Sequence, residues 1–246
     1  MSAYRELAPS AELHPVVACR WVRRVPEEPG DGSTLVLPDG CVDLIWRDGE
    51  LVVAGLDRRA RRSPIRAGET IVGVRLRPGM AGAVLGIPAS EVLDEHPAFE
   101  EVVDRRAREL SGRLAEANGE TEAFEHLEGL VAAQLGEGEP DPLVLAATRR
   151  LGFPDSRVDW LADALGISDR QLRRRFHRAV GYGPKTLDRV LRFRRLVAQA
   201  RALSAGEADL ARVAADLGYA DQAHMTRDCL RLSGLTPSAL VTLWAG

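Results

Sequence analysis

The segment LADALGISDRQLRRRFHRAVGYGPKTL at residues 161–187 recurs, in altered form, as VAADLGYADQAHMTRDCLRLSGLTPSAL at residues 213–240. Matching positions are 52 residues apart up to Gly166 and Gly218, and 53 residues apart after them. One residue has therefore been added after the first helix of the second copy, while the register otherwise persists. Such a duplication predicts two copies of one structural unit.

Each copy has the order of a helix-turn-helix. A short amphipathic helix ends at Gly166 or Gly218, because glycine readily adopts the left-handed backbone that stops a helix. In the first copy, Ser168 followed by Gln171 predicts a capping box at the start of the second helix. In the second copy, Asp221 is the matching N-cap.

The second helix of each copy suits the major groove of DNA. In the first copy Leu172, Phe176 and Val180 recur every four residues and predict one buried stripe. Polar and arginine side chains occupy the opposite face, where they can reach base edges. We predict DNA contacts from these residues: Asp169, Arg170, Arg173, Arg174 and His177 in the first copy, and Gln222, Ala223, Thr226, Arg227 and Arg231 in the second. The alternative is that they form a solvated helix face.

The second copy resembles the AraC/XylS family of transcription regulators. Its Leu217-Gly-Tyr-x-Asp-Gln222 run, its Arg227 and its Gly234-Leu-Thr-Pro237 run are similar to that family's signature. The resemblance implies that the helix between the units, residues 184–203, holds both units against successive major grooves. It also implies double-stranded DNA and RNA polymerase as partners. Met225 and Cys229 stand where the family usually has phenylalanine.

The charge is distributed unevenly along the chain. Residues 1–140 carry a net charge of −9 and residues 141–246 a net charge of +6, so we expect only the second part to meet a polyanion. The second helix of the first copy holds five arginines, Arg170, Arg173, Arg174, Arg175 and Arg178. In the second copy Asp228 stands between Arg227 and Arg231, and we expect it to oppose DNA binding unless it pairs with Arg231.

The fold class predicted is α+β. The β-rich runs are residues 34–37, 41–46, 51–54 and 70–76, and Asp48-Gly49 predicts a hairpin between the second and third. Helical spacing begins after Pro78. Glycine and proline at residues 136–142 predict a boundary between a regulatory or dimerisation domain, 1–140, and an all-α DNA-binding domain, 141–246. In the latter we predict helices at 142–151, 158–165, 169–180, 184–203, 210–217, 222–232 and 237–244.

Two segments of the N-terminal half, Leu37–Ile45 and Gly73–Gly79, resemble a poorly characterised β-rich domain found ahead of some AraC-type DNA-binding domains. That resemblance implies a sensory role with a small-molecule effector, or a role in homodimer formation. The alternative is a regulator with stoichiometric thiol chemistry, redox or alkylation sensing, at Cys41. The Pro-Cys-His-Arg motif of methyl-accepting domains is absent, and a cysteine on a β-rich run is usually an inert hydrophobe.

The sequence gives no pattern for catalysis. His14, His96 and His126 lack the spacing of metal ligands, so we expect no metal, no cofactor and no enzymatic activity. Asp39 and Asp43 are expected to stabilise a turn rather than act as acids. Three cysteines without a C-x-x-C pair, no signal peptide and no apolar run of about 20 residues favour a cytoplasmic protein that does not enter a membrane.

Overall fold

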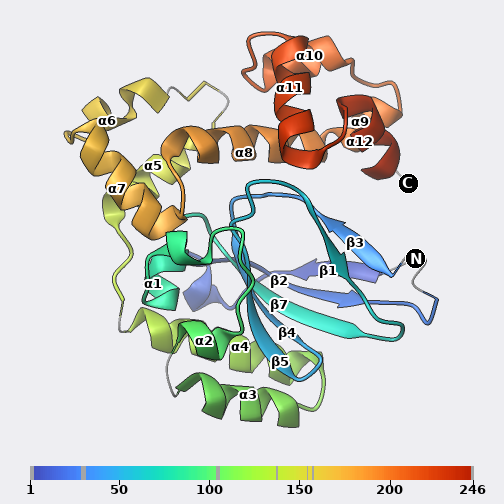
Figure 1. Cartoon of the computed structure of the whole chain (residues 1–246), viewed down its shortest axis with the longest axis vertical. Helices are drawn as coiled ribbons and strands as arrows, with labels where there is room; N and C mark the ends of the chain where they lie inside the picture. Colours follow the sequence, from blue (N-terminus) through green and yellow to red (C-terminus); the bar gives the residue numbers. More distant parts are fainter. Residues whose placement is uncertain are drawn as a thin grey trace.

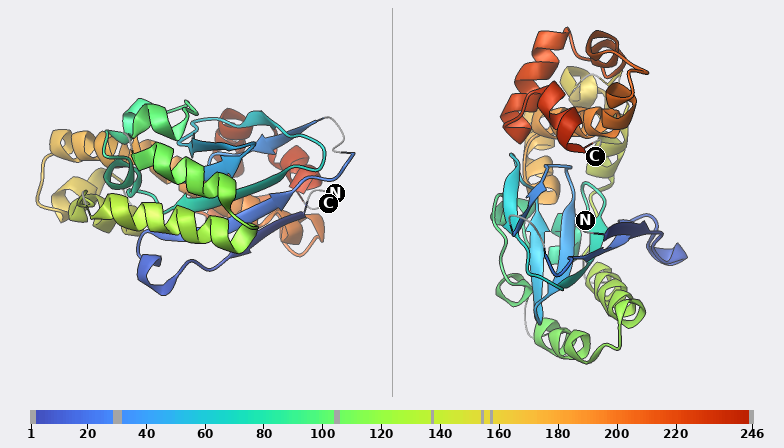
Figure 2. Two further views of the ribbon diagram at one scale, coloured as in Figure 1. Left: turned by 90° about the horizontal axis from the view of Figure 1, so that it is seen from below. Right: turned by 90° about the vertical axis from the view of Figure 1, so that its right-hand side faces the viewer.

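The computed structural model describes residues 3–28, 32–103, 106–136, 138–153, 155–156 and 158–244. It is an α+β structure, as predicted: a β-rich N-terminal half with its own helices is followed by an all-helical half (Figure 1). The sheet lies between the helices of the second half at one end of the molecule and two helices, α3 (Arg106–Glu116) and α4 (Glu120–Leu135), at the other (Figures 1 and 2). Glu137, inside the predicted boundary, is outside the described residues.

The described part of the N-terminal half contains two antiparallel sheets. The larger has the order β1 (Ala3–Leu7), β2 (Val17–Arg24), β7 (Thr70–Leu76), β4 (Val42–Arg47) and β5 (Glu50–Gly55). The smaller is a ribbon of β3 (Ser33–Val36) and β6 (Arg61–Pro64). The predicted hairpin is confirmed, because Asp48 and Gly49 both have positive φ, 52° and 79°, between β4 and β5. Strands β1, β2 and β6 were not among the predicted runs.

The two faces of the larger sheet are covered by different groups. Val74 and Leu44 point to the face covered by α4 (Glu120–Leu135), where Phe124 and Leu127 complete the core. The other face carries Trp21 of β2, which lies against Gly73 of the neighbouring strand. A Cβ at Gly73 would lie 2.5 Å from the indole ring, so only glycine lets the indole pack there.

The remaining helices mostly follow the predicted pattern. The N-terminal half also has α1 (Ala81–Leu85), α2 (Phe99–Val102), α3 (Arg106–Glu116) and short 3-10 turns at Ala11–Leu13 and Ala89–Val92. The second half has α5 (Pro142–Leu151), α6 (Leu161–Ala164), α7 (Asp169–Val180), α8 (Pro184–Ala198), α9 (Ala200–Ser204), α10 (Leu210–Asp216), α11 (Gln222–Ser233) and α12 (Pro237–Trp244). Two predicted helices differ: 158–165 begins as a 3-10 turn, Val158–Trp160, and 184–203 breaks at Gln199 into α8 and α9.

Helix α8 belongs to two hydrophobic cores. Its Leu187 and Leu191 join the core that runs from the sheet through α1, α4, α5 and α7. Its Val190, Phe193 and Leu196 join a second core with α10, α11 and α12. The first helix-turn-helix unit thus packs against the N-terminal half, and the domain division at residue 140 stays a prediction that a test of independent folding would settle.

The contact between α1 and α7 generates a first prediction. A Cβ at Gly82 would lie 2.5 Å from the carbonyl oxygen of Arg178 and 3.2 Å from Cα of Ala179. Gly82→Ala should therefore lower the free energy of unfolding by about 1–3 kcal/mol, because α1 must move off α7. Gly129→Ala in α4 is the control, since a Cβ there meets nothing within 4 Å and alanine favours helix. Equal melting temperatures of the two variants would show that α1 can move away from α7 without a loss of stability.

Candidate nucleic-acid interface and adjoining cavity

Local sequence fixes both ends of α7. The Ser168 hydroxyl accepts from the Gln171 amide at 3.3 Å while the Gln171 side chain accepts from the Ser168 amide at 2.9 Å, which confirms the capping box. The helix ends at Gly181, whose φ is 86°. Leu172, Phe176 and Val180 are buried as predicted.

The outer face of α7 carries the residues predicted to meet DNA. All five side chains are exposed: Asp169, Arg170, Arg173, Arg174 and His177. Within the described part of the chain, none of the three arginines makes an ion pair. These guanidinium groups are therefore available to phosphate or base edges, although their contact with DNA stays a prediction.

Arg175 is half-buried at the edge of this face and, unlike the five residues above, makes an ion pair. Its Nη1 lies 2.6 Å from Oδ2 of Asp141, the N-cap residue of α5. The Asp141 carboxylate also accepts the amide of Leu143 at 3.0 Å. Arg175 therefore ties α7 to the start of α5, and counting it with the charges available to DNA was wrong.

Helix α11 repeats the construction of α7. The Asp221 carboxylate accepts the His224 amide at 2.5 Å and confirms the predicted N-cap, while Gly234 ends the helix with φ 73°. Met225 and Cys229 are fully buried in the second core. Their substitution for phenylalanine thus leaves an apolar core, as expected.

The outer face of α11 differs from that of α7 in chemistry. Gln222, Ala223, Arg227 and Arg231 are exposed, and Thr226 is half-buried. The Thr226 hydroxyl donates to the Gln222 carbonyl at 2.9 Å, so it is already engaged inside the helix. Leu230, which was not predicted, is 43% exposed on this helix. The 53-residue offset, which matches Leu230 to His177, was the signal that could have found it.

Asp228 does not oppose DNA. It is buried, and its Oδ1 lies 3.1 Å from Nε of Arg189 on α8, with His224 Nε2 3.6 Å from the other oxygen. Both expectations for this residue, a charge facing DNA and a pair with Arg231, are wrong. By register Asp228 matches Arg175, so the second helix of each unit, α7 or α11 (the recognition helices), uses this position for an ion pair to a neighbouring helix.

A loop of the N-terminal half touches the carboxyl ends of both recognition helices. Leu56 contacts the end of α7, where a Cβ at Gly181 would come within 2.8 Å of Leu56 Cδ1. Four residues later the Ala60 amide donates to the Leu232 carbonyl of α11 at 2.6 Å. Leu56 has a φ of 57°, which costs a non-glycine residue about 1–2 kcal/mol, and its side chain is 2% exposed. Burial of this side chain holds the strained loop, Leu56–Ala60, in place.

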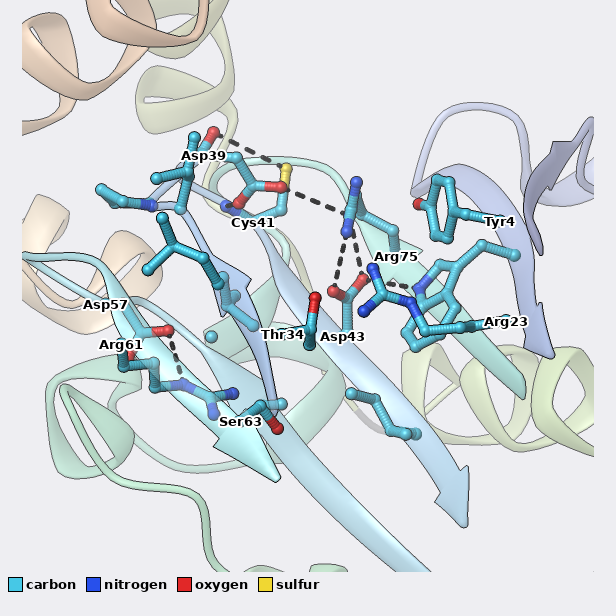
Figure 3. A pocket seen from close by; sticks show the side chains of 18 of the residues that line it. Tyr4, Arg23, Thr34, Asp39, Cys41, Asp43, Asp57, Arg61, Ser63 and Arg75 are labelled. Carbon is cyan, nitrogen blue, oxygen red and sulfur yellow. Dashed lines mark hydrogen bonds and ion pairs between the residues drawn. The ribbon is translucent and has the colours of Figure 1, made fainter. Parts of the chain in front are cut away.

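A cavity of about 710 Å³ lies beside this loop (Figure 3). Its walls are the Trp21 face of the larger sheet, the β3–β6 ribbon, the residues Gly55–Asp57 and the carboxyl end of α8. Helix α8 contributes Arg194, Val197 and Ala198. One cavity is thus bounded by the sheet and by the helix that holds both helix-turn-helix units.

An ion-pair cluster occupies one wall of the cavity. Arg75 meets both oxygens of Asp43 at 3.0 Å and Asp39 at 3.4 Å, and the Trp21 indole donates to Asp43 at 3.2 Å (Figure 3). Burial alone would lower the pKa of Arg75, but the two carboxylates outweigh it and raise that pKa. Burial raises the pKa of Asp43, and Arg75 opposes that rise. Asp43 therefore pairs with Arg75 instead of stabilising a turn.

Two further arginines line the cavity without a carboxylate partner in the described chain. Arg23 stacks over the Tyr4 ring at 5.5 Å, and burial lowers its pKa. Arg194 reaches the sulfur of Cys41 at 4.0 Å. Arg23 is half-buried and Arg194 is exposed at the cavity wall, and neither has a carboxylate partner among the described residues. An acidic group entering the cavity would therefore meet two guanidinium groups that no acid neutralises.

The thiol of Cys41 is not set up as a nucleophile. Its side chain is buried, and burial together with the charge of Asp39 raises its pKa well above the ordinary value. A reactive thiol needs a lowered pKa and access to solvent. The Cys41 amide donates to Asp39 at 2.9 Å, so Asp39 stabilises the turn as expected. The structure gives thiol chemistry no support.

The predicted absence of metal ligands can be compared with the described residues. No group of three or more His, Cys, Asp or Glu side chains there is arranged to hold a metal ion. His96 instead lies 3.3 Å from Asp57, and His126 lies 3.9 Å from Glu122. None of the described helices is both long enough and apolar enough to span a membrane.

Comparisons with known proteins match two regions. Residues 161–242 match the family described as a helix-turn-helix domain, and residues 5–98 match a domain of unknown function, DUF6597. Similar solved structures include ToxT from Vibrio cholerae O395 (10% identity, 100% of this chain and 98% of that chain, TM-score 0.44). Another is unsaturated fatty acid bound wild-type ToxT from Vibrio cholerae strain SCE256 (9% identity, 100% and 96%, TM-score 0.41). The curated protein sequences contain no match.

One matched region lies in each structural half, and residues 99–160 lie between them. The helix-turn-helix match starts at α6 and ends in α12, so it covers both copies of the repeat and α8 between them. The other match covers the two sheets and α1. The chain is therefore a DNA-binding transcription regulator that carries an AraC-type helix-turn-helix domain behind an N-terminal domain of unknown function.

Proposed function

We propose that the protein binds specific DNA sequences through α7 and α11 and that its N-terminal half controls this binding. The observation that carries the proposal is the pair of capped helices in one register, each with an exposed polar face. Arg170, Arg173 and Arg174 have no ion-pair partner in the described chain, so DNA does not have to displace an acid to reach them.

The control proposed for the N-terminal half acts through two contacts. The Leu56–Ala60 loop touches the ends of both recognition helices, and the cavity wall includes α8. A molecule in the cavity would therefore change the environment of Arg194 on the helix that spaces the two units. Recruitment of RNA polymerase and formation of a homodimer are further expectations that follow from the resemblance.

The distribution of free arginines generates a prediction on affinity. Neutralising Arg173 and Arg174 together should weaken operator binding and reduce its salt dependence more than Arg231→Ala does, because each phosphate contact adds to both. A single arginine that reads a base should cost about 1–3 kcal/mol. Titrations of operator DNA at two salt concentrations measure both quantities. If Arg231→Ala weakens operator binding more than the double change does, the second unit contributes more of the affinity than the first.

The charge of Asp228 suggests that neutralising it should tighten DNA binding, and its buried position predicts the opposite. Asp228→Asn should leave operator binding no tighter and should lower the free energy of unfolding by about 1–3 kcal/mol, since Arg189 loses a buried charged partner. The matched control is Asp216→Asn, whose pair with Arg212 is largely exposed and is worth about 0–1 kcal/mol. Tighter DNA binding by Asp228→Asn would contradict its assignment to the interior.

The unpaired Arg23 and Arg194 generate a prediction on the effector. We expect small organic acids with an apolar body, and not their methyl esters, to raise the melting temperature of the whole chain and to change its operator affinity. Arg194→Ala should abolish both effects, whereas Arg150→Ala outside the cavity should not. If no acid shifts the melting temperature while the mass in solution rises with protein concentration, the N-terminal half serves dimerisation instead.

A further inference from the structure

We propose that the two helix-turn-helix units read chemically different DNA. Helix α7 takes a half-site rich in G·C pairs, and α11 takes a half-site of A·T pairs whose thymine methyl groups it contacts. This inference rests on the proposed sequence-specific binding and names the partner that each helix recognises.

The face of α7 matches guanine. Arg170, Arg173 and Arg174 are exposed without an ion pair in the described chain, and a guanidinium group donates two hydrogen bonds to O6 and N7 of guanine. Asp169 at the start of the helix is exposed and can accept from the amino group of cytosine. All four side chains therefore favour the two bases of a G·C pair.

The face of α11 replaces these charges with apolar groups. At a 53-residue offset, Ala223 stands where α7 has Arg170, and Leu230 stands where α7 has His177. Both are exposed, and residues four and seven positions apart lie on one side of a helix, so they flank Arg227. The Thr226 hydroxyl is bonded to the Gln222 carbonyl at 2.9 Å, which leaves the methyl group as its free end.

Apolar groups on a recognition helix have one specific target in the major groove. The 5-methyl of thymine is the apolar group that a base pair displays there, and the amide of Gln222 can bond N6 and N7 of the paired adenine. One exposed leucine is ordinary on a protein surface. Leu230 differs because it shares its face with Ala223 and Arg227 at the positions that the repeat assigns to DNA.

The first experiment selects bound duplexes from a random DNA library with the whole chain. The expected result is a G·C-rich segment and an A·T-rich segment about 10 base pairs apart, one turn of the duplex. Two segments of equal composition would overturn the inference. Failure to enrich any sequence would instead overturn the proposed sequence-specific binding, so the two failures are distinguishable.

The second experiment removes thymine methyl groups by placing deoxyuridine in the A·T-rich segment. Each methyl that α11 contacts should cost about fourfold in affinity, the effect of burying one methyl-sized group. Leu230→Ala should bind thymine and deoxyuridine operators more nearly alike. Leu243→Ala, which removes another exposed leucine, on α12, should keep the full difference. Equal binding of the two operators by the unaltered protein, or an undiminished difference in Leu230→Ala, would overturn the inference.

Discussion

The position of α8 in two cores is the constraint on which the DNA-binding half depends. Leu187 and Leu191 face one core while Phe193 and Leu196 face the other, so the helix cannot rotate without exposing apolar surface on both sides. The buried pair of Asp228 with Arg189 fixes α11 on the same helix. An exposed linker would leave the two recognition helices independent, whereas this helix sets their separation and their relative phase.

The N-terminal half meets this assembly at places that bear on DNA recognition. Its loop from Leu56 to Ala60 reaches both α7 and α11, and the carboxyl end of α8 forms part of the wall of its cavity. Because packed cores deform little before they rearrange, an occupant of the cavity would act on the spacing of the reading helices rather than on their side chains. The cavity and the helix that carries both helix-turn-helix units therefore share a boundary in one chain.

Charge counting along the sequence misjudged two residues for one physical reason. Arg175 and Asp228 occupy the same position of their helices, and at that position each side chain reaches an ion-pair partner on a neighbouring helix. A charge turned toward a packed neighbour needs a partner, and it acquires one that lies 34 or 39 residues away in the chain. The other arginines of α7 are exposed, and no ion pair within the described residues engages them.

The sequence by itself determined the local parts of this protein. The repeat, the caps at Ser168 and Asp221 and the glycine stops placed α7 and α11 to within a residue, because these signals act between neighbours in the chain. Tertiary structure alone decided the pairing of β1 and β6, the partners of Arg175 and Asp228, the cavity, and the contact of Ala60 with Leu232. Each of these joins residues far apart in sequence, so its formation depends on how the elements pack and leaves no mark in local periodicity.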